Sequence, residues 1–153
     1  MSKVKIPFKH NGIHDCDAAV LACIDFRFRD ALLQFIKDHW EGIKHFDFPS
    51  IPGGVKALNE GSNLAWRCLS VPYELHNVNV MILVNHTDCG AYGGSSNFST
   101  HEEEVAFHRD ALLESKKKAE ERFCTNPDKE VVVITILAEW RRDDNMIHFV
   151  IIE

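Results

Sequence analysis

The sequence lacks a long apolar run: none approaches the roughly 18 residues that a membrane-spanning helix needs. The N-terminal stretch MSKVKIPFKHNGIHD (1–15) also lacks the apolar core of a secretory signal. Basic residues are scattered apart from the lysines at 116–118, and the formal net charge is -6. The sequence therefore offers neither a membrane anchor nor the basic patch of nucleic-acid-binding proteins, and we expect a cytoplasmic protein.

The cysteines are five, not the even number that a disulfide framework requires. In a chain without a secretion signal, such thiols are typically buried, metal-bound or catalytic. Cys16, Cys68 and Cys124 are expected to be ordinary thiols: Cys68 lies on an apolar helical stripe, and HDC (14–16) lacks matching ligands nearby. Cys23 and Cys89 stand in a different context.

The chain alternates apolar runs with amphipathic stretches, without internal repeats or a linker, so we expect one domain over residues 1–153. Strands are expected at 18–24, 43–51, 78–84, 130–140 and 146–153. Helices are expected at 29–40, along a stripe of Leu64, Cys68, Val71 and Leu75, and from about His101 to Phe123. This order predicts an α/β fold: a mostly parallel central sheet flanked by helices, with a C-terminal antiparallel edge hairpin.

Metal-ligating side chains follow two of the expected strands. Cys23 ends the first, and His86 and Cys89 follow the third in NHTDCGAYGG (85–94). If these strands are neighbours, their carboxyl ends bring the three side chains to one rim of the sheet. Two thiolates and one imidazole match the preference of zinc, and three ligands leave a fourth position for water or substrate. The pattern therefore predicts a catalytic zinc site.

Asp25 and Arg27 follow Cys23 at alternate positions in CIDFR, on one side of the chain if it stays extended. A guanidinium beside a carboxylate keeps that carboxylate ionised and orients it. We expect Asp25 to accept a proton from a zinc-bound water. An ordinary surface ion pair is the alternative, and it would stabilise little.

Three glycines are expected at the substrate pocket. Gly53 and Gly54 should bring the backbone close to the site, and Gly90 should supply a backbone N–H at the start of a turn or helix. His101 and His108 lie on a charged helix and are expected to be solvated, although either could shuttle protons to bulk water.

Together the motifs Cys-x-Asp-x-Arg and, some sixty residues later, His-x-x-Cys-Gly resemble the β-class carbonic anhydrases. The matching residues are Cys23, Asp25, Arg27, His86, Cys89 and Gly90, with Thr87 and Asp88 completing the HTDCG form. The resemblance implies a zinc enzyme that reversibly hydrates carbon dioxide to bicarbonate through a zinc-bound hydroxide, working as a homodimer or higher homo-oligomer. It also implies Zn2+ bound by Cys23, His86 and Cys89, with Asp25 and Arg27 as a dyad beside the metal.

Departures from the family pattern suggest alternatives. IPGGV (51–55) stands where family members carry an Arg-Asn-Ala-Gly-Asn-like segment, and Ile24 and Phe26 replace small polar residues. Such a greasier rim equally suits carbon disulfide or carbonyl sulfide, so a hydrolase of these molecules is one alternative. A second alternative is a non-catalytic zinc-binding protein, in which Asp25 is the fourth zinc ligand and closes the site. Ten phenylalanines also suggest an apolar surface that a partner subunit covers.

Overall fold

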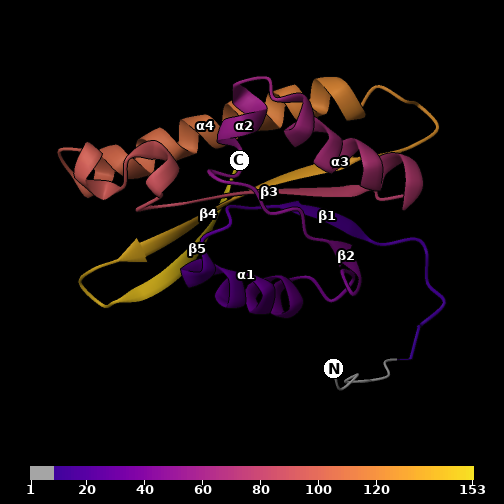
Figure 1. Ribbon diagram of the computed structural model, residues 1–153, viewed down its shortest axis with the longest axis horizontal. Coiled ribbons are helices and arrows are strands. Elements are labelled where there is room, and N and C mark those ends of the chain that lie inside the picture. The colour runs from indigo at the N-terminus through magenta and orange to yellow at the C-terminus, as the bar shows by residue number, and fades with distance from the viewer. Residues whose placement is uncertain (1–8) are drawn as a thin grey trace, which may run out of the picture.

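In the computed structural model, which describes residues 9–153, a five-stranded sheet lies between helices (Figure 1). Part of the N-terminal stretch that lacks a signal pattern, residues 1–8, lies outside this range. The elements are β1 (Ala18–Leu21), α1 (Phe26–His39), β2 (Phe46–Asp47), α2 (Lys56–Asn59), α3 (Asn63–Leu75), β3 (Val80–His86), α4 (His101–Phe123), β4 (Val132–Arg141) and β5 (Met146–Ile152).

The strands are ordered β2-β1-β3-β4-β5. The first four are parallel, and β5 pairs antiparallel with β4. Every crossover between parallel strands contains a helix, as such connections require. The α/β fold with a mostly parallel sheet and a C-terminal antiparallel edge strand is thus confirmed.

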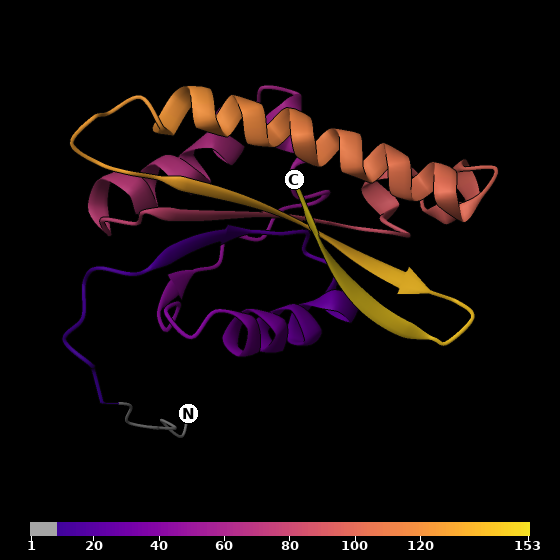
Figure 2. The same ribbon diagram turned by 180° about the vertical axis from the view of Figure 1, so that it is seen from behind.

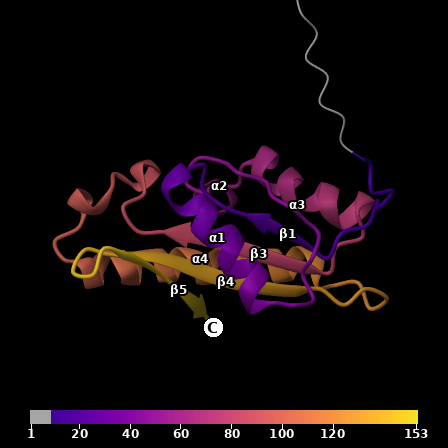
Figure 3. The same cartoon turned by 90° about the horizontal axis from the view of Figure 1, so that it is seen from below.

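The two faces of the sheet bury separate apolar cores. One face packs against α1, and the other packs against α3 and α4, as the view from behind shows (Figure 2). Seen from below, α1 crosses over the middle of the sheet (Figure 3). Successive residues of β1 and β3 alternate between the two cores, which is why both segments read as continuous apolar runs. Among residues 9–153, every helix is too short or too polar to cross a bilayer.

The second strand is much shorter than the expected 43–51. Only Phe46 and Asp47 form β2, because Pro49 has no N–H with which to continue the ladder. Beyond it, Ala22 donates to the Pro49 carbonyl at 3.2 Å and accepts from the Ile51 N–H at 3.0 Å. The chain after Pro49 therefore stays beside the end of β1 without forming a regular strand.

The stripe expected along α3 is wrong. Leu64 and Leu75 are 69% and 59% exposed, and the other two members are only half-buried. The helix instead buries Ala65, Leu69 and Pro72. Leu69 with the smaller Ala65 and Pro72 forms the face that packs on the sheet, one position along the helix from the predicted Leu64 and Cys68.

Candidate metal centre

The three predicted metal ligands lie at the carboxyl ends of adjacent strands. β1 pairs with β3, with Leu21 opposite Leu83, and His86 is the last residue of β3. β1 ends at Leu21, three residues before the end of the expected strand 18–24, so Cys23 lies in the short loop that leads to α1. The parallel pairing brings segments some sixty residues apart to one rim of the sheet.

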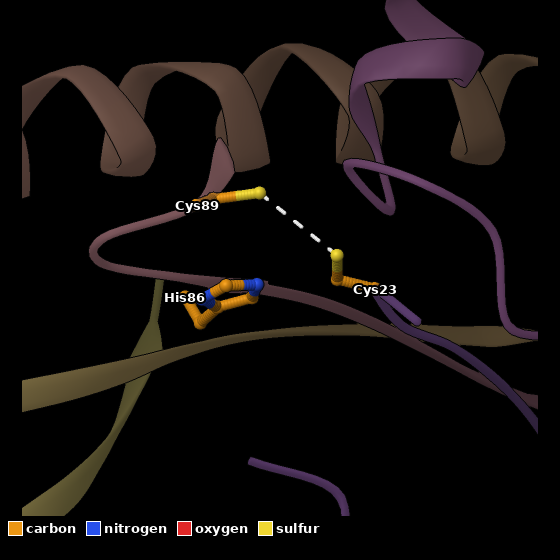
Figure 4. Close-up of side chains that lie close together, drawn as sticks. All are labelled: Cys23, His86 and Cys89. Atoms are coloured by element: carbon orange, nitrogen blue, oxygen red, sulfur yellow. Dashed lines mark hydrogen bonds between the residues drawn. The ribbon is translucent and has the colours of Figure 1, made fainter. Parts of the chain in front are cut away.

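The donor atoms of these residues converge. The Sγ atoms of Cys23 and Cys89 are 3.9 Å apart, and one donor atom from each of the three residues lies within 4.8 Å of the others. Figure 4 shows one nitrogen of the His86 ring turned toward the two sulfurs. All five cysteines of the chain are free thiols.

The His86 ring is held by its other nitrogen. Nδ1 lies 2.7 Å from the Thr87 carbonyl oxygen, and the ring packs on Phe28 with centroids 4.2 Å apart. Because a carbonyl oxygen only accepts, Nδ1 carries the proton and Nε2 presents its lone pair. Nε2 is buried and has no hydrogen-bond partner among the residues that the structure describes. A buried nitrogen without a partner, facing two thiols, fits a borderline-soft divalent cation such as zinc.

The Cys23 and Cys89 thiols share a hydrogen bond that shifts their pKa values in opposite directions. The hydrogen bond from Cys89 lowers the pKa of Cys23, and the same contact, together with burial, raises the pKa of Cys89. The backbone N–H of Gly53 also points to the Cys23 sulfur, at 3.4 Å. Of the two thiols, Cys23 is therefore the more easily deprotonated.

Asp25 and Arg27 meet in a way that the sequence did not predict. The chain is not extended there: α1 begins at Phe26, and Asp25 is its N-cap, accepting the Arg27 N–H at 3.0 Å. The Arg27 guanidinium then turns back and donates to both Asp25 oxygens, from Nε at 3.0 and 3.1 Å and from Nη2 at 2.6 Å. This contact lowers the pKa of Asp25.

Arg27 also reaches the turn that carries Cys89. Its Nη1 donates to Asp88 Oδ2 at 2.7 Å and its Nη2 to the Asp88 carbonyl at 3.1 Å. One guanidinium thus connects the loop after β1 to the turn after β3. It also places Asp25 Oδ2 at 4.0 Å from Nε2 of His86.

The predicted glycines differ in their surroundings. Gly54 has a φ of +54°, and a Cβ there would lie 2.7 Å from the Val84 oxygen and 3.3 Å from the Cys23 nitrogen. Gly53 has a φ of +75°, and a Cβ there would lie 2.9 Å from the Ala91 side chain. Gly90 begins a short 3-10 turn, Gly90–Tyr92. Gly53 and Gly54 therefore allow close approach of the backbone to the site.

Sequence reasoning missed a buried polar pair behind the site, and the expectation that His108 is solvated is wrong. His108 and Glu104 on α4 are 0% and 1% exposed. Glu104 Oε1 accepts the Asp88 N–H at 2.6 Å, and Asn85 lies 3.4 Å from the His108 ring. Their four-residue spacing, in phase with the buried Leu112, was the available signal. His101, by contrast, is partly exposed and lies 2.9 Å from Glu139.

A small hollow adjoins two of the three donor residues, Cys23 and His86, and also Asp25. Its volume is about 10 Å³, close to what one water molecule occupies. Apolar side chains, including Phe28, Val84 and Ala138, line it together with Cys23 and His86. The site can therefore admit only very small molecules on this side.

The chain resembles known proteins in sequence and in fold. A family model described as "Putative carbonic anhydrase" matches residues 13–135. Two uncharacterized proteins, from Rickettsia conorii and Rickettsia bellii, are each 28% identical over 131 residues, which cover 79% of this chain and 69% and 79% of the relatives.

Two solved structures share the fold. A carbonic anhydrase from Glaciozyma antarctica has a TM-score of 0.54 at 18% identity, covering 90% of this chain and 83% of that one. The β-carbonic anhydrase isoform I from Trichomonas vaginalis has a TM-score of 0.53 at 15% identity, covering 95% and 88%. The likeness in both cases is one of overall architecture.

Proposed function

This chain belongs to the putative carbonic anhydrase family, and we propose that it catalyses the reversible hydration of carbon dioxide to bicarbonate with one Zn2+ held by Cys23, His86 and Cys89. The observation that carries the proposal is the buried, unpartnered Nε2 of His86 facing two sulfurs, within the part of the chain described by the structure. Two thiolates and one imidazole are a zinc donor set, and three ligands leave one position open.

Cys23, His86 and Cys89 would hold the Zn2+, which would act as a Lewis acid and lower the pKa of a bound water toward neutrality. Asp25 Oδ2, 4.0 Å from His86 Nε2, would accept a hydrogen bond from a reactant beside the donors and so orient it. Arg27 keeps that carboxylate ionised and fixes its direction through three hydrogen bonds. Thr87 holds the His86 ring by its carbonyl oxygen, so that Nε2 keeps its lone pair free.

The same contacts favour an open site over one closed by Asp25. Both oxygens of Asp25 already accept from Arg27, and Oδ2 is 4.0 Å from His86 Nε2. To become a fourth ligand, the carboxylate would have to give up charge-assisted hydrogen bonds. These contacts support a catalytic role rather than a purely structural metal.

The substrate we propose is small and apolar, because the hollow beside Cys23 has apolar walls and about the room of one water molecule. The exposed Ile24 and Phe26, at 59% and 83%, extend this apolar character outward. They also support an alternative function, the hydrolysis of carbonyl sulfide or carbon disulfide. An apolar rim does not distinguish a substrate with carbon–oxygen bonds from one with carbon–sulfur bonds.

We further propose that the protein works as a homodimer or higher homo-oligomer in the cytoplasm. A phenylalanine 83% exposed beside the site is an apolar surface that a second copy would cover. Five free thiols suit a reducing compartment.

The test combines metal analysis with stopped-flow assays on carbon dioxide, carbonyl sulfide and carbon disulfide. Cys23→Ser should lose zinc from the site and with it turnover, whereas Cys124→Ser, which changes an exposed thiol at the far end of α4, should retain both. Turnover of the sulfur compounds alone would favour the alternative function, a hydrolase of carbonyl sulfide or carbon disulfide. Zinc without turnover of any of them would overturn both enzymatic functions.

A further inference from the structure

A second cluster of potential ligands lies at the opposite end of β1 from Cys23. Cys16 lies two residues before β1, Asp47 ends β2, and His76 is the C-cap of α3. These segments meet at the right of the view in Figure 1. Asp47 Oδ2 lies 3.6 Å from Cys16 Sγ and 2.6 Å from His76 Nδ1, and the three donor atoms are all within 4.8 Å of one another.

Backbone hydrogen bonds hold the three segments in place. The Cys16 N–H donates to the His76 carbonyl at 2.9 Å, which ties the residues before β1 to the end of α3. Asp17 donates its N–H to the His45 carbonyl at 2.8 Å, and its Oδ2 accepts from the N–H groups of Lys44 and His45 at 2.9 Å each. The cluster is therefore built on backbone fixed independently of the three side chains.

The distances are close to those of a tetrahedral metal site. With bonds of about 2.3 Å to sulfur and about 2.1 Å to oxygen, tetrahedral zinc places the two ligand atoms about 3.6 Å apart. The Cys16–Asp47 separation is 3.6 Å. A nitrogen and an oxygen ligand would lie about 3.4 Å apart, so the His76–Asp47 pair would open by about 0.8 Å on binding. Both side chains are about one-third exposed and can make this move.

The cluster does not have the arrangement of a catalytic thiol. Its imidazole contacts the carboxylate, and the Cys16 sulfur contacts that carboxylate rather than the imidazole, so the thiol–imidazole contact of a Cys–His nucleophile is missing among these three residues. Instead, a thiol, an imidazole and a carboxylate all present donor atoms to one point, the combination that a borderline-soft divalent cation accepts.

An open hollow gives an ion access to this point. Its volume is about 540 Å³, and Cys16, Asp47 and His76 line it together with His14 and His45. The His14 ring packs edge-on against His76, with centroids 5.3 Å apart. A water molecule or His14 can therefore complete a set of four ligands.

We propose that Cys16, Asp47 and His76 bind a second divalent cation of the zinc type, separate from the one at Cys23. This cation is structural: it links the residues before β1 to β2 and to α3, at the end of the sheet away from Cys23. The proposal does not depend on the proposed function, because it uses none of the residues of that site.

Zinc analysis of the wild type and of cysteine variants tests the proposal. The wild type should hold about two zinc ions per chain, Cys16→Ser and Cys23→Ser about one each, and the double variant none. Cys68→Ser, a half-buried thiol on α3, is the matched control and should hold as many as the wild type. Cys16→Ser holding as much zinc as the wild type would overturn the proposal. A single zinc lost on Cys16→Ser but kept in Cys23→Ser would support it while contradicting the proposed catalytic centre.

Cobalt provides a second readout that does not require Cys16→Ser to fold. Co2+ titrated into Cys23→Ser should produce a thiolate-to-metal absorption band and raise the melting temperature. His76→Gln in the Cys23→Ser background should weaken cobalt binding at least tenfold, because one of three protein ligands is lost. Cys23→Ser that takes up Co2+ without a thiolate band would also overturn the proposal.

Discussion

Replacing Gly54 by alanine tests whether the close packing behind Cys23 has the cost that its geometry implies. A non-glycine residue in the left-handed region costs roughly 1–2 kcal/mol. The new Cβ would also lie 2.7 Å from the Val84 carbonyl oxygen, a backbone atom that cannot turn away. Such overpacking adds about 1–3 kcal/mol, so Gly54→Ala should lower the free energy of unfolding by about 2–5 kcal/mol.

Gly61→Ala is the matched control for this variant. Gly61 has a φ of +76°, but a Cβ there would meet nothing within 4 Å in the described part of the chain, residues 9–153. It should cost only the conformational strain, roughly 1–2 kcal/mol. The entropy that alanine removes from the unfolded chain is the same at both positions and cancels in the comparison. Urea unfolding of the metal-free proteins measures both values, and equal losses would refute the packing argument.

Three further predictions concern the polar groups around the centre. Arg27→Lys keeps the charge but cannot bridge Asp25 and Asp88. Therefore kcat/KM for carbon dioxide should fall roughly 10–100-fold, with unchanged zinc content. Stopped-flow assays that show full turnover would contradict this prediction. Glu104→Ala leaves the partly buried Asp88 N–H without its acceptor and should cost about 1–3 kcal/mol in urea unfolding. Glu104→Gln retains an acceptor oxygen and should cost less, so equal losses would count against this role. Burial lowers the pKa of His108 to about 4, so the unfolded chain takes up a proton there first as the pH falls below about 6.5. The stability that neutral His108 contributes is thus present above pH 6.5 and declines by about 3 kcal/mol toward pH 4. His108→Gln should lack this decline. Parallel curves of unfolding free energy against pH for the two proteins would refute the prediction.

The convergence of Cys23 with His86 could be predicted because it depends on a regular feature. Two continuous apolar runs mark buried parallel strands, and residues after such strands share one edge of the sheet. The contact between Asp25 and Arg27 was predicted for the wrong reason. An N-cap and an extended segment both bring residues i and i+2 together, and the sequence does not distinguish the two.

Other features could not be read from the sequence because they depend on which residues meet in space. The spacing of Glu104 and His108, in phase with Leu112, could have indicated their burial, but their contact with the turn at Asp88 could not be read from it. The partners of Cys16, which are Asp47 and His76, lie far along the chain, and a strand expected at 43–51 does not tell which residues meet Asp47. Their meeting is a result of tertiary structure alone.

The crossover between β1 and β3 makes the centre a reporter on folding. Cys23 follows β1 and His86 ends β3, neighbouring strands whose pairing closes a loop of about sixty residues, and such long-range pairing is slow compared with helix formation. A metal ion can bind all three ligands only after that loop has closed. In a refolding experiment with cobalt on Cys16→Ser, which removes the thiolate of the second proposed site, the rise of the thiolate band after dilution from denaturant would therefore time the closure of the crossover, and not the earlier collapse of the chain.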